Sequence, residues 1–384
     1  MFHTRSTRLR HPALVLGVGL SLLLAACAGG TDEPTESAAT SEEDTTDEAD
    51  DADDDATEEA DDGTDDGTDD ASSEVDRANI VATTSILGDL VENLVDGEAD
   101  VEVIMPAGTD PHGFEPSASD GRLLREADLV VANGLDLEES MLSILDAAED
   151  EGVTVFTLAD KLDPIDFDWD GPGHDDEHGH DDDDGHGQEE DEHGHDHDGG
   201  DPHFWFDPTR SAEGVELLAA ELAEHSESLD EATLSERAQA YADELLALDD
   251  QMASMFETIP EGNRQLVTNH DALGYLADRY GFEVVGTVIP GASTQAEQDP
   301  AGFAALIETV EEAQVPAVFA ENTDSTTLAE QLQSEVVGRG DLDVDVVRIY
   351  TDALGEDGSG AETYIGLLET TSTLITEALG GSAD

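Results

Sequence analysis

The sequence predicts an α/β fold of two lobes, each a four-stranded parallel sheet with flanking helices, joined by a single long helix. Apolar strand-like segments alternate with amphipathic helical segments in two separate runs, and this alternation is typical of parallel sheets. Between the runs, residues 232–259 carry an apolar stripe at helical spacing without Gly or Pro. At ~1.5 Å per residue this helix would reach roughly 42 Å, enough to connect two lobes.

The first run predicts strands at 79–83, 101–105, 129–133 and 153–157 and helices at 85–95, 120–127 and 138–148. Helices at 208–226 and 232–259 follow. The second run predicts strands at 265–269, 282–287, 317–320 and 344–350 and helices at 272–280, 301–313, 325–337 and 361–379. Ligands of open α/β sheets bind beyond the carboxyl ends of the strands, so we expect the functional residues at strand ends that face each other across a cleft.

The N-terminus has the pattern of an export signal. Three arginines precede an almost wholly apolar stretch at 12–26, and Leu24-Ala25-Ala26-Cys27 follows. The apolar stretch is shorter than the ~20 residues of a membrane-spanning helix. Cys27 lies where a bacterial lipoprotein signal peptidase would cut, so we expect it to carry the lipid that anchors the protein outside the cell membrane. An ordinary signal peptide with an incidental cysteine is the alternative.

The composition is strongly acidic, with 97 Asp and Glu against 13 Lys and Arg and a formal charge of −84. Nucleic acid is excluded as a partner because binding phosphate needs a basic surface. The single cysteine excludes an internal disulfide and multi-cysteine metal sites. Residues 27–76 are acidic, lack Lys and Arg, and should form a disordered tether because they cannot bury enough apolar surface to offset the ordering entropy.

The chain accordingly divides into a signal peptide, a tether, two lobes and the helices between them. The ranges are 1–26 for the signal peptide, 27–76 for the tether, 77–210 for the N-terminal lobe, 211–260 for the linking helices and 261–384 for the C-terminal lobe.

A low-complexity insertion at 162–201 in the N-terminal lobe is rich in aspartate and histidine. Its histidines are His174, His178, His180, His186, His193, His195 and His197. Clustered neutral imidazoles and carboxylates could collect metal ions weakly and pass them on, and the repeated His-Gly-His favours this interpretation over an acidic linker with incidental histidines. We expect a tight site elsewhere to survive deletion of the insertion.

Three of the remaining histidines lie at predicted strand ends. His112 is in Asp-Pro-His-Gly-Phe-Glu-Pro, His203 is in Asp-Pro-His-Phe-Trp-Phe-Asp-Pro, and His270 follows the first strand of the second run. Three imidazoles converging from loops match a zinc site that lacks a fourth ligand, and Asp352, directly after the last predicted strand, is a candidate for that ligand. Histidines that only satisfy loop hydrogen bonds are the alternative. His225 lies on an ordinary amphipathic helix, and we interpret it as a surface residue.

From about residue 77 onward, the chain resembles the substrate-binding lipoproteins of zinc and manganese ABC transporters. The matching motifs are Asp110–Pro116, Asp201–Pro208, Asn269–Tyr275 and Thr351–Gly355, in this order. The resemblance implies two α/β lobes joined by one long helix, and it places the metal ligands at His112, His203, His270 and Asp352. It also implies a lipid-anchored, extracytoplasmic monomer that is not an enzyme and that delivers its metal to a membrane permease with its ATPase.

The third histidine favours Zn²⁺ as the transported ligand. Manganese members of the family tend to have a glutamate where this chain has His270, and three nitrogens with one carboxylate suit tetrahedral zinc. Manganese remains the main alternative, and the affinity order does not exclude copper or nickel. A zinc hydrolase is disfavoured because no His-Glu-x-x-His motif occurs and Asp352 would close the site. A metal-buffering adhesin would need no permease.

Several neighbours of the candidate ligands are open to two interpretations. Glu115, Asn269 and Asp271 could orient ligands, and Phe204 and Trp205 could exclude water. All five are equally compatible with ordinary core or turn chemistry.

Overall fold

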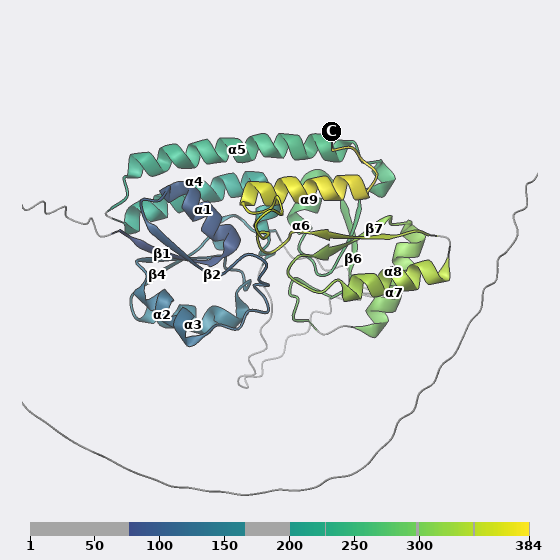
Figure 1. The fold of residues 1–384 in the computed structure, drawn as a ribbon, viewed down its shortest axis with the longest axis horizontal. Helices are drawn as coiled ribbons and strands as arrows, with labels where there is room; N and C mark the ends of the chain where they lie inside the picture. Colours follow the sequence, from purple (N-terminus) through teal and green to yellow (C-terminus); the bar gives the residue numbers. More distant parts are fainter. Residues whose placement is uncertain (1–76, 166–199, 227, 297–298, 341, 384) are drawn as a thin grey trace, which may run out of the picture. The chain divides into compact units, whose positions relative to one another are not determined.

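The computed structural model describes residues 77–165, 200–226, 228–296, 299–340 and 342–383. The first sheet contains β1 (Asn79–Thr84), β2 (Asp100–Met105), β3 (Leu129–Ala132) and β4 (Thr154–Thr157) in the order β2-β1-β3-β4, with all pairs parallel. Its helices are α1 (Ser85–Val95), α2 (Ala118–Glu126) and α3 (Leu142–Asp150). We call this sheet, with these helices and the loops that follow its strands as far as residue 207, the first lobe (Figure 1).

The second sheet repeats the same topology. Its strands are β5 (Gln265–Thr268), β6 (Glu283–Thr287), β7 (Ala317–Glu321) and β8 (Asp345–Ile349), parallel and in the order β6-β5-β7-β8. Its helices are α6 (Gly274–Tyr280), α7 (Pro300–Ala313), α8 (Thr327–Arg339) and α9 (Tyr364–Ala378). This is the second lobe, and the pair of sheets confirms the predicted fold class.

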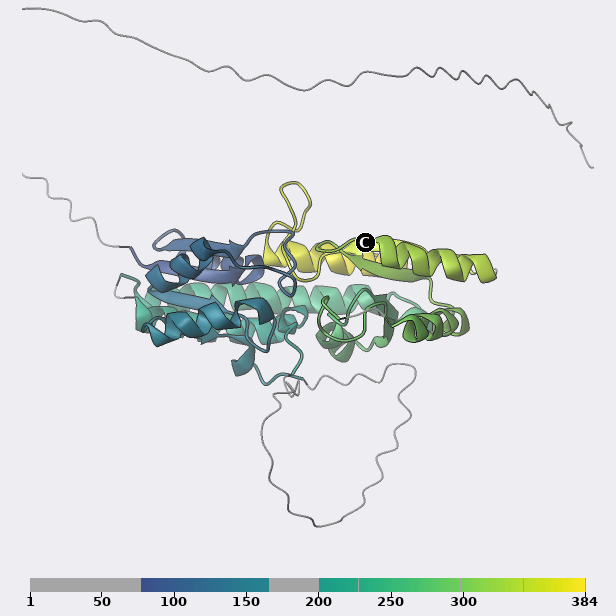
Figure 2. The ribbon, with the colours of Figure 1, turned by 90° about the horizontal axis from the view of Figure 1, so that it is seen from below.

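Two helices lie between the sheets in the sequence, α4 (Pro208–His225) and α5 (Glu231–Glu257). With 27 residues, α5 is roughly 40 Å long and passes both lobes (Figures 1 and 2). Its buried face, which includes Leu245, Leu248, Met252 and Phe256, belongs to one apolar cluster that also contains residues of both sheets. The long helix is therefore part of the core of each lobe.

The last helix of the chain also contacts the first lobe. α9 begins at Tyr364, whose backbone N–H donates to Asp89 of α1 at 3.0 Å. The Tyr364 hydroxyl is 2.7 Å from the Ser211 hydroxyl of α4. The second lobe is thus fastened to the first through α9 as well as through the covalent link of α5.

The predicted elements are confirmed, with shifts at several ends. α2 begins earlier than predicted because Ser117 and Asp120 form a capping box. α9 begins later because the Thr363 side chain accepts from Gly366 and caps the helix there. The predicted helix at 138–148 starts as a 3₁₀ turn, Glu139–Met141. None of the described helices is long and apolar enough to cross a membrane.

The predicted signal peptide, the tether with Cys27 and all seven histidines of the insertion lie outside the described residues. The division of the chain at 76, 210 and 260 stays a prediction.

Candidate metal centre

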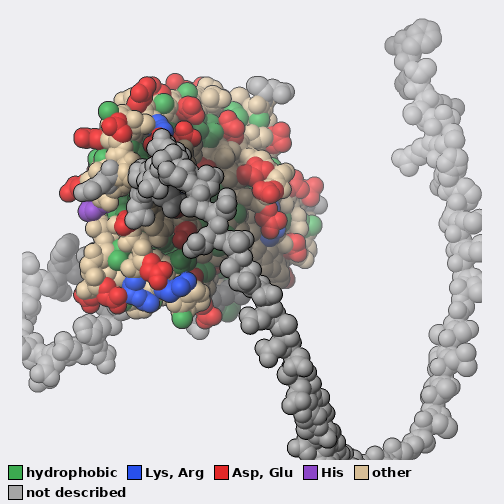
Figure 3. Space-filling model, turned by 60° about the vertical axis from the view of Figure 1, so that its left-hand side comes forward, with side chains coloured by type: hydrophobic (Ala, Val, Ile, Leu, Met, Phe, Trp, Pro, Cys, Tyr) green, Lys and Arg blue, Asp and Glu red, His purple; other side chains and the backbone are tan. Residues whose placement is uncertain are grey.

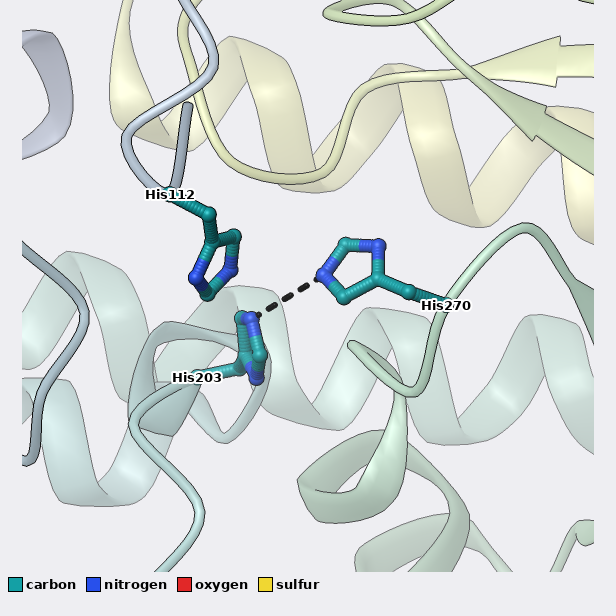
Figure 4. Close-up of side chains that lie close together, drawn as sticks. All are labelled: His112, His203 and His270. Carbon is teal, nitrogen blue, oxygen red and sulfur yellow. Dashed lines mark hydrogen bonds between the residues drawn. The ribbon is translucent and has the colours of Figure 1, made fainter. Parts of the chain in front are cut away.

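Four buried side chains meet where strand ends of the two lobes face each other. His112 follows β2, His203 precedes the turn Phe204–Phe206, His270 follows β5 and Asp352 follows β8. Each is at most 5% exposed. The three imidazoles point toward one another from separate loops (Figure 4), so the structure brings together all four residues that the sequence singled out.

The spacing of their polar atoms fits the edges of a small coordination polyhedron. Nε2 of His203 and Nε2 of His270 are 3.3 Å apart. Asp352 places Oδ1 3.7 Å from Nε2 of His203 and Oδ2 3.6 Å from Nε2 of His270. Ligand atoms at zinc bond lengths of 2.0–2.1 Å are roughly 3.3–3.4 Å apart in a tetrahedron. One nitrogen from each histidine lies within 4.8 Å of the others, so His112 completes the set.

The two Asp-Pro-His turns orient their histidines in the same way. Asp110 accepts the backbone N–H of His112 at 3.0 Å, and Asp201 accepts that of His203 at 2.9 Å. Such Asx turns fix the side-chain direction two residues on. Asp201 Oδ1 is also 2.7 Å from Nδ1 of His203. When Nδ1 donates this hydrogen bond, Nε2 keeps its lone pair for a cation.

In the second lobe, Glu321 does for His270 what Asp201 does for His203. It ends β7, is fully buried, and accepts the His270 backbone N–H at 3.1 Å. The same oxygen is 2.6 Å from Nδ1 of His270, which leaves Nε2 facing the centre. With His270 and Asp352, Glu321 forms a second group of ligand atoms within 4.8 Å of one another. Sequence reasoning missed Glu321; its only sequence signal is an acidic residue at the carboxyl end of an apolar strand.

The pKa values of the candidate histidine ligands are shifted in opposite directions in the two lobes. Burial, with the charge of His270, lowers the pKa values of His112 and His203 well below the usual range. Burial also opposes charge on His270, but Glu321 and Asp352 outweigh it and raise its pKa to about 10. Burial raises the pKa of Asp352. Without a cation, the second-lobe side of the centre therefore retains a proton.

Some buried atoms of the centre have no hydrogen-bond partner among the described residues. They are Nε2 of His112, both carboxylate oxygens of Asp352 and one oxygen of Glu321. A buried polar atom without a partner costs about 1–3 kcal/mol. Four such atoms at one place are the donor set that a cation requires, three of them on candidate ligands.

A cavity of about 350 Å³ lies beside His112. Residues on the first-lobe side include Asp136 and Pro202, and Gly291 and Ser293 are among those contributed by the segment after β6. The cavity therefore lies between the lobes, and His112 is the candidate ligand that borders it.

Four further residues considered in the sequence have no hydrogen bond to the candidate ligands in the described structure: Glu115, Asn269, Asp271 and His225. Glu115 is exposed. Asn269 is buried and donates to Asp324 at 3.3 Å. Asp271 is partly buried, and burial with the nearby Asp201 raises its pKa to about 6. His225 is half-buried, 3.1 Å from Glu221, and lies apart from the centre.

The aromatic neighbours of His203 are buried, which fits both interpretations of them. The Trp205 ring centroid lies 5.2 Å from that of His203, and Phe204 packs against Trp205 at 5.8 Å. Together they leave this side of His203 inaccessible to solvent.

Comparison with known proteins identifies the family. The family model described as "Zinc-uptake complex component A periplasmic" matches residues 80–378. The chain is 30% identical to the manganese-binding lipoprotein MntA of Halalkalibacterium halodurans over 76% of this chain and 84% of that protein. It is 28% identical to the zinc-binding protein TroA of Treponema pallidum over 78% of this chain and 88% of that protein.

Solved structures agree with this assignment. The periplasmic zinc-binding protein TroA of Treponema pallidum superposes with a TM-score of 0.66 and 26% identity, over 79% of this chain and 99% of that one. The family match covers both sheets and all four residues of the candidate centre. The chain therefore belongs to the family of the periplasmic zinc-uptake complex component A, as its motifs indicated.

Proposed function

We propose that this protein captures Zn²⁺ between its lobes outside the cell membrane and delivers it to an ABC permease. The observation that carries the proposal is the convergence of His112, His203, His270 and Asp352. The facing atoms of the last three lie 3.3–3.7 Å apart, close to the edge length of a zinc tetrahedron. The family and the relatives named for zinc and manganese binding support metal capture. Zinc is the cargo here, held reversibly and released.

The donor set favours zinc over harder ions. Three imidazole nitrogens and one carboxylate suit Zn²⁺, whereas Mn²⁺ prefers more oxygen ligands. Asp201 and Glu321 fix the tautomers of two histidines so that Nε2 faces the ion, an arrangement typical of zinc sites. Acidic side chains are also spread over the face drawn in Figure 3, and their field raises the local concentration of cations.

The same geometry supports binding and delivery rather than catalysis. A hydrolytic zinc centre keeps one position for water. Here Asp352 is buried, its two oxygens lie 3.7 and 3.6 Å from Nε2 of His203 and of His270, and it would supply the fourth ligand. A four-ligand site of this kind has no vertex at which a metal-bound hydroxide would form.

Manganese is the second candidate, and Glu321 is the observation that favours it. Its free oxygen belongs to the group formed with His270 and Asp352, so a shift of His270 would offer a further carboxylate to a harder ion. Two relatives point in different directions, since MntA is named for manganese and TroA for zinc.

Membrane attachment through Cys27, a permease with its ATPase, and a monomeric state complete the proposal. Replacement of Cys27 by serine should release the protein from the membrane fraction. A metal-buffering adhesin would protect cells from metal starvation without any permease, whereas an importer component would not.

Calorimetric titration with zinc and with manganese tests the proposal. The seven histidines of the insertion are replaced by serine to remove weak sites, and this background is compared with and without His270→Ala. We expect one tight zinc site, weaker manganese binding, and a loss of zinc affinity of at least about a hundredfold in His270→Ala. His225→Ala is the matched control and should bind like the background. Tight manganese with weak zinc would support the second candidate, and no effect of His270→Ala would refute this ligand set.

A further inference from the structure

Trp205 connects a candidate ligand of the first lobe with a candidate ligand of the second. It lies two residues after His203, and its side chain is 2% exposed. Its ring meets the His203 imidazole edge to face, at 5.2 Å and 74°. Its indole N–H donates to the carbonyl oxygen of Thr351 at 2.9 Å, and Thr351 immediately precedes Asp352. One side chain thus contacts His203 and the backbone that carries Asp352.

Among the described residues, the hydrogen bond to Thr351 is the indole N–H's only one. The side chain has a single polar group, a donor, and a buried indole needs an acceptor for it. The acceptor is itself fully buried, because Thr351 has no exposed surface. Loss of the donor would leave that buried carbonyl without this partner and without access to water. The cost of the unpaired carbonyl would favour a shift of the Thr351–Asp352 backbone.

The turn that carries Trp205 is itself held from the second lobe. The Tyr364 hydroxyl, at the start of α9, donates to the Trp205 carbonyl oxygen, and the Ser211 hydroxyl lies 2.7 Å from Tyr364. Because backbone and side chain of Trp205 are both bonded to the second lobe, its ring direction is fixed. A fixed ring can set the position of the strand end to which it is bonded.

We propose that Trp205 is a positioning residue for metal retention. By holding Thr351, it keeps the Asp352 carboxylate 3.7 Å from Nε2 of His203 and so slows release of the bound ion. This inference rests on the proposed function, because it requires His203 and Asp352 to bind the same ion. A ring that only filled the core would contribute to stability and leave the release rate unchanged.

The first test compares Trp205→Phe with Phe206→Leu in the full chain. Trp205→Phe removes the N–H and keeps an aromatic ring. Phe206 is fully buried in the same turn and has no polar side-chain atom, so Phe206→Leu is the matched control for lost packing. Zinc release to an excess of chelator is followed by stopped flow, and the slowest phase is compared. We expect Trp205→Phe to release zinc about tenfold faster, the effect of one buried hydrogen bond, and Phe206→Leu less than twofold faster.

The second test asks whether Trp205 acts through Asp352. Zinc affinity is measured for Trp205→Phe, Asp352→Asn and the double variant from the rise in melting temperature over a series of zinc concentrations, which reports weak sites as well as tight ones. We expect Trp205→Phe to change affinity less than twofold once Asp352 is replaced, because coupled residues are not additive. Equal effects in both backgrounds, or release from Trp205→Phe no faster than from Phe206→Leu, would overturn this inference alone. A wild-type protein without a tight zinc site would overturn the proposed function itself.

Discussion

The two lobes share one topology but supply different chemistry to the centre between them. Both sheets have the same strand order, yet the first lobe contributes two nitrogens, from His112 and His203, and the second contributes His270 with two carboxylates. The pKa values of the first pair are lowered, whereas that of His270 is raised. The shared fold therefore provides strand ends that face each other, and the loops after those ends decide the chemistry.

This difference separates two tasks. The first lobe presents neutral imidazoles that need not lose a proton before a cation binds. The second lobe holds two carboxyl groups, Glu321 and Asp352, and a proton on His270, whose pKa they raise to about 10. A divalent cation can replace that proton. We therefore expect the second lobe to balance the charge of the bound ion.

We expect the largest loss of zinc affinity when one candidate ligand is removed from either lobe. We expect His203→Ala and Asp352→Ala each to lower zinc affinity at least about a hundredfold, since four ligands together supply about 10–16 kcal/mol in zinc sites. Asp352→Ala should have the larger effect because it removes a ligand and a charge. Competition with a chelator of known affinity measures both. If either variant retained the wild-type affinity, the ion would be bound by one lobe alone.

The carboxylates behind two histidines form a matched pair for a second test. Asp201→Asn removes the anionic partner of Nδ1 in His203, and Glu321→Gln does the same for His270. We expect each to weaken zinc binding about 10–100-fold, as is usual for such partners, when measured by the same competition. Asp299→Asn, which removes the carboxylate that caps α7, controls for charge alone and should leave affinity unchanged. An unchanged affinity in Glu321→Gln would show that His270 needs no orienting partner.

The sequence indicates the four candidate ligands because each has a local signal. His270 and Asp352 lie within three residues of a strand end, so strand direction alone places them at the sheet edge. His112 and His203 each follow an Asp-Pro pair, which predicts a turn that orients the imidazole. Glu321 is different, since its partner His270 lies 51 positions away and nothing beside it indicates the pairing. The hydrogen bond from Trp205 to Thr351 spans 146 positions. Glu115 shows the converse, because it is close to His112 in sequence, yet it is exposed and has no hydrogen bond to the candidate ligands in the described structure.

The raised pKa of His270 predicts how the metal-free protein responds to pH. An unfolded histidine has a pKa near 6.5, and the folded value is about 10, so the folded state binds this proton more tightly. Its contribution to stability is full below pH ~6.5 and is lost as the pH rises toward 10. Burial raises the pKa of Asp352, which makes stability fall with pH in the same direction.

We therefore expect the melting temperature of the metal-free protein to fall between pH 6.5 and 10. The zinc-bound protein should show a smaller fall, because the ion replaces the proton. Thermal unfolding in matched buffers measures both profiles, and the metal-free His270→Ala variant should have the flatter one. A metal-free melting temperature that rises over this range would contradict the assigned charges.

The smallest effect is expected where each lobe is fastened to α5 by one arginine. Arg237 of α5 donates to the carbonyl oxygens of Leu94 and Val95 at the end of α1, at 3.0 and 3.1 Å. In the second lobe, Arg279 of α6 forms a two-pronged pair with Asp249 of α5. Lysine keeps the charge at either position but loses the planar fork. Both arginine side chains are partly exposed, so Arg237→Lys and Arg279→Lys should each reduce the free energy of unfolding by only about 1 kcal/mol.

Zinc affinity should change less than threefold in both variants, because in the described part of the chain neither arginine hydrogen-bonds to a candidate ligand. Urea unfolding and the chelator competition measure the two quantities on the same samples. A tenfold loss of affinity in Arg279→Lys, with Arg237→Lys unchanged, would show that the attachment of the second lobe to α5 sets the position of His270. Helix α5 would then help to position the binding site. The two lobes would differ in their attachment to α5 as well as in their loops.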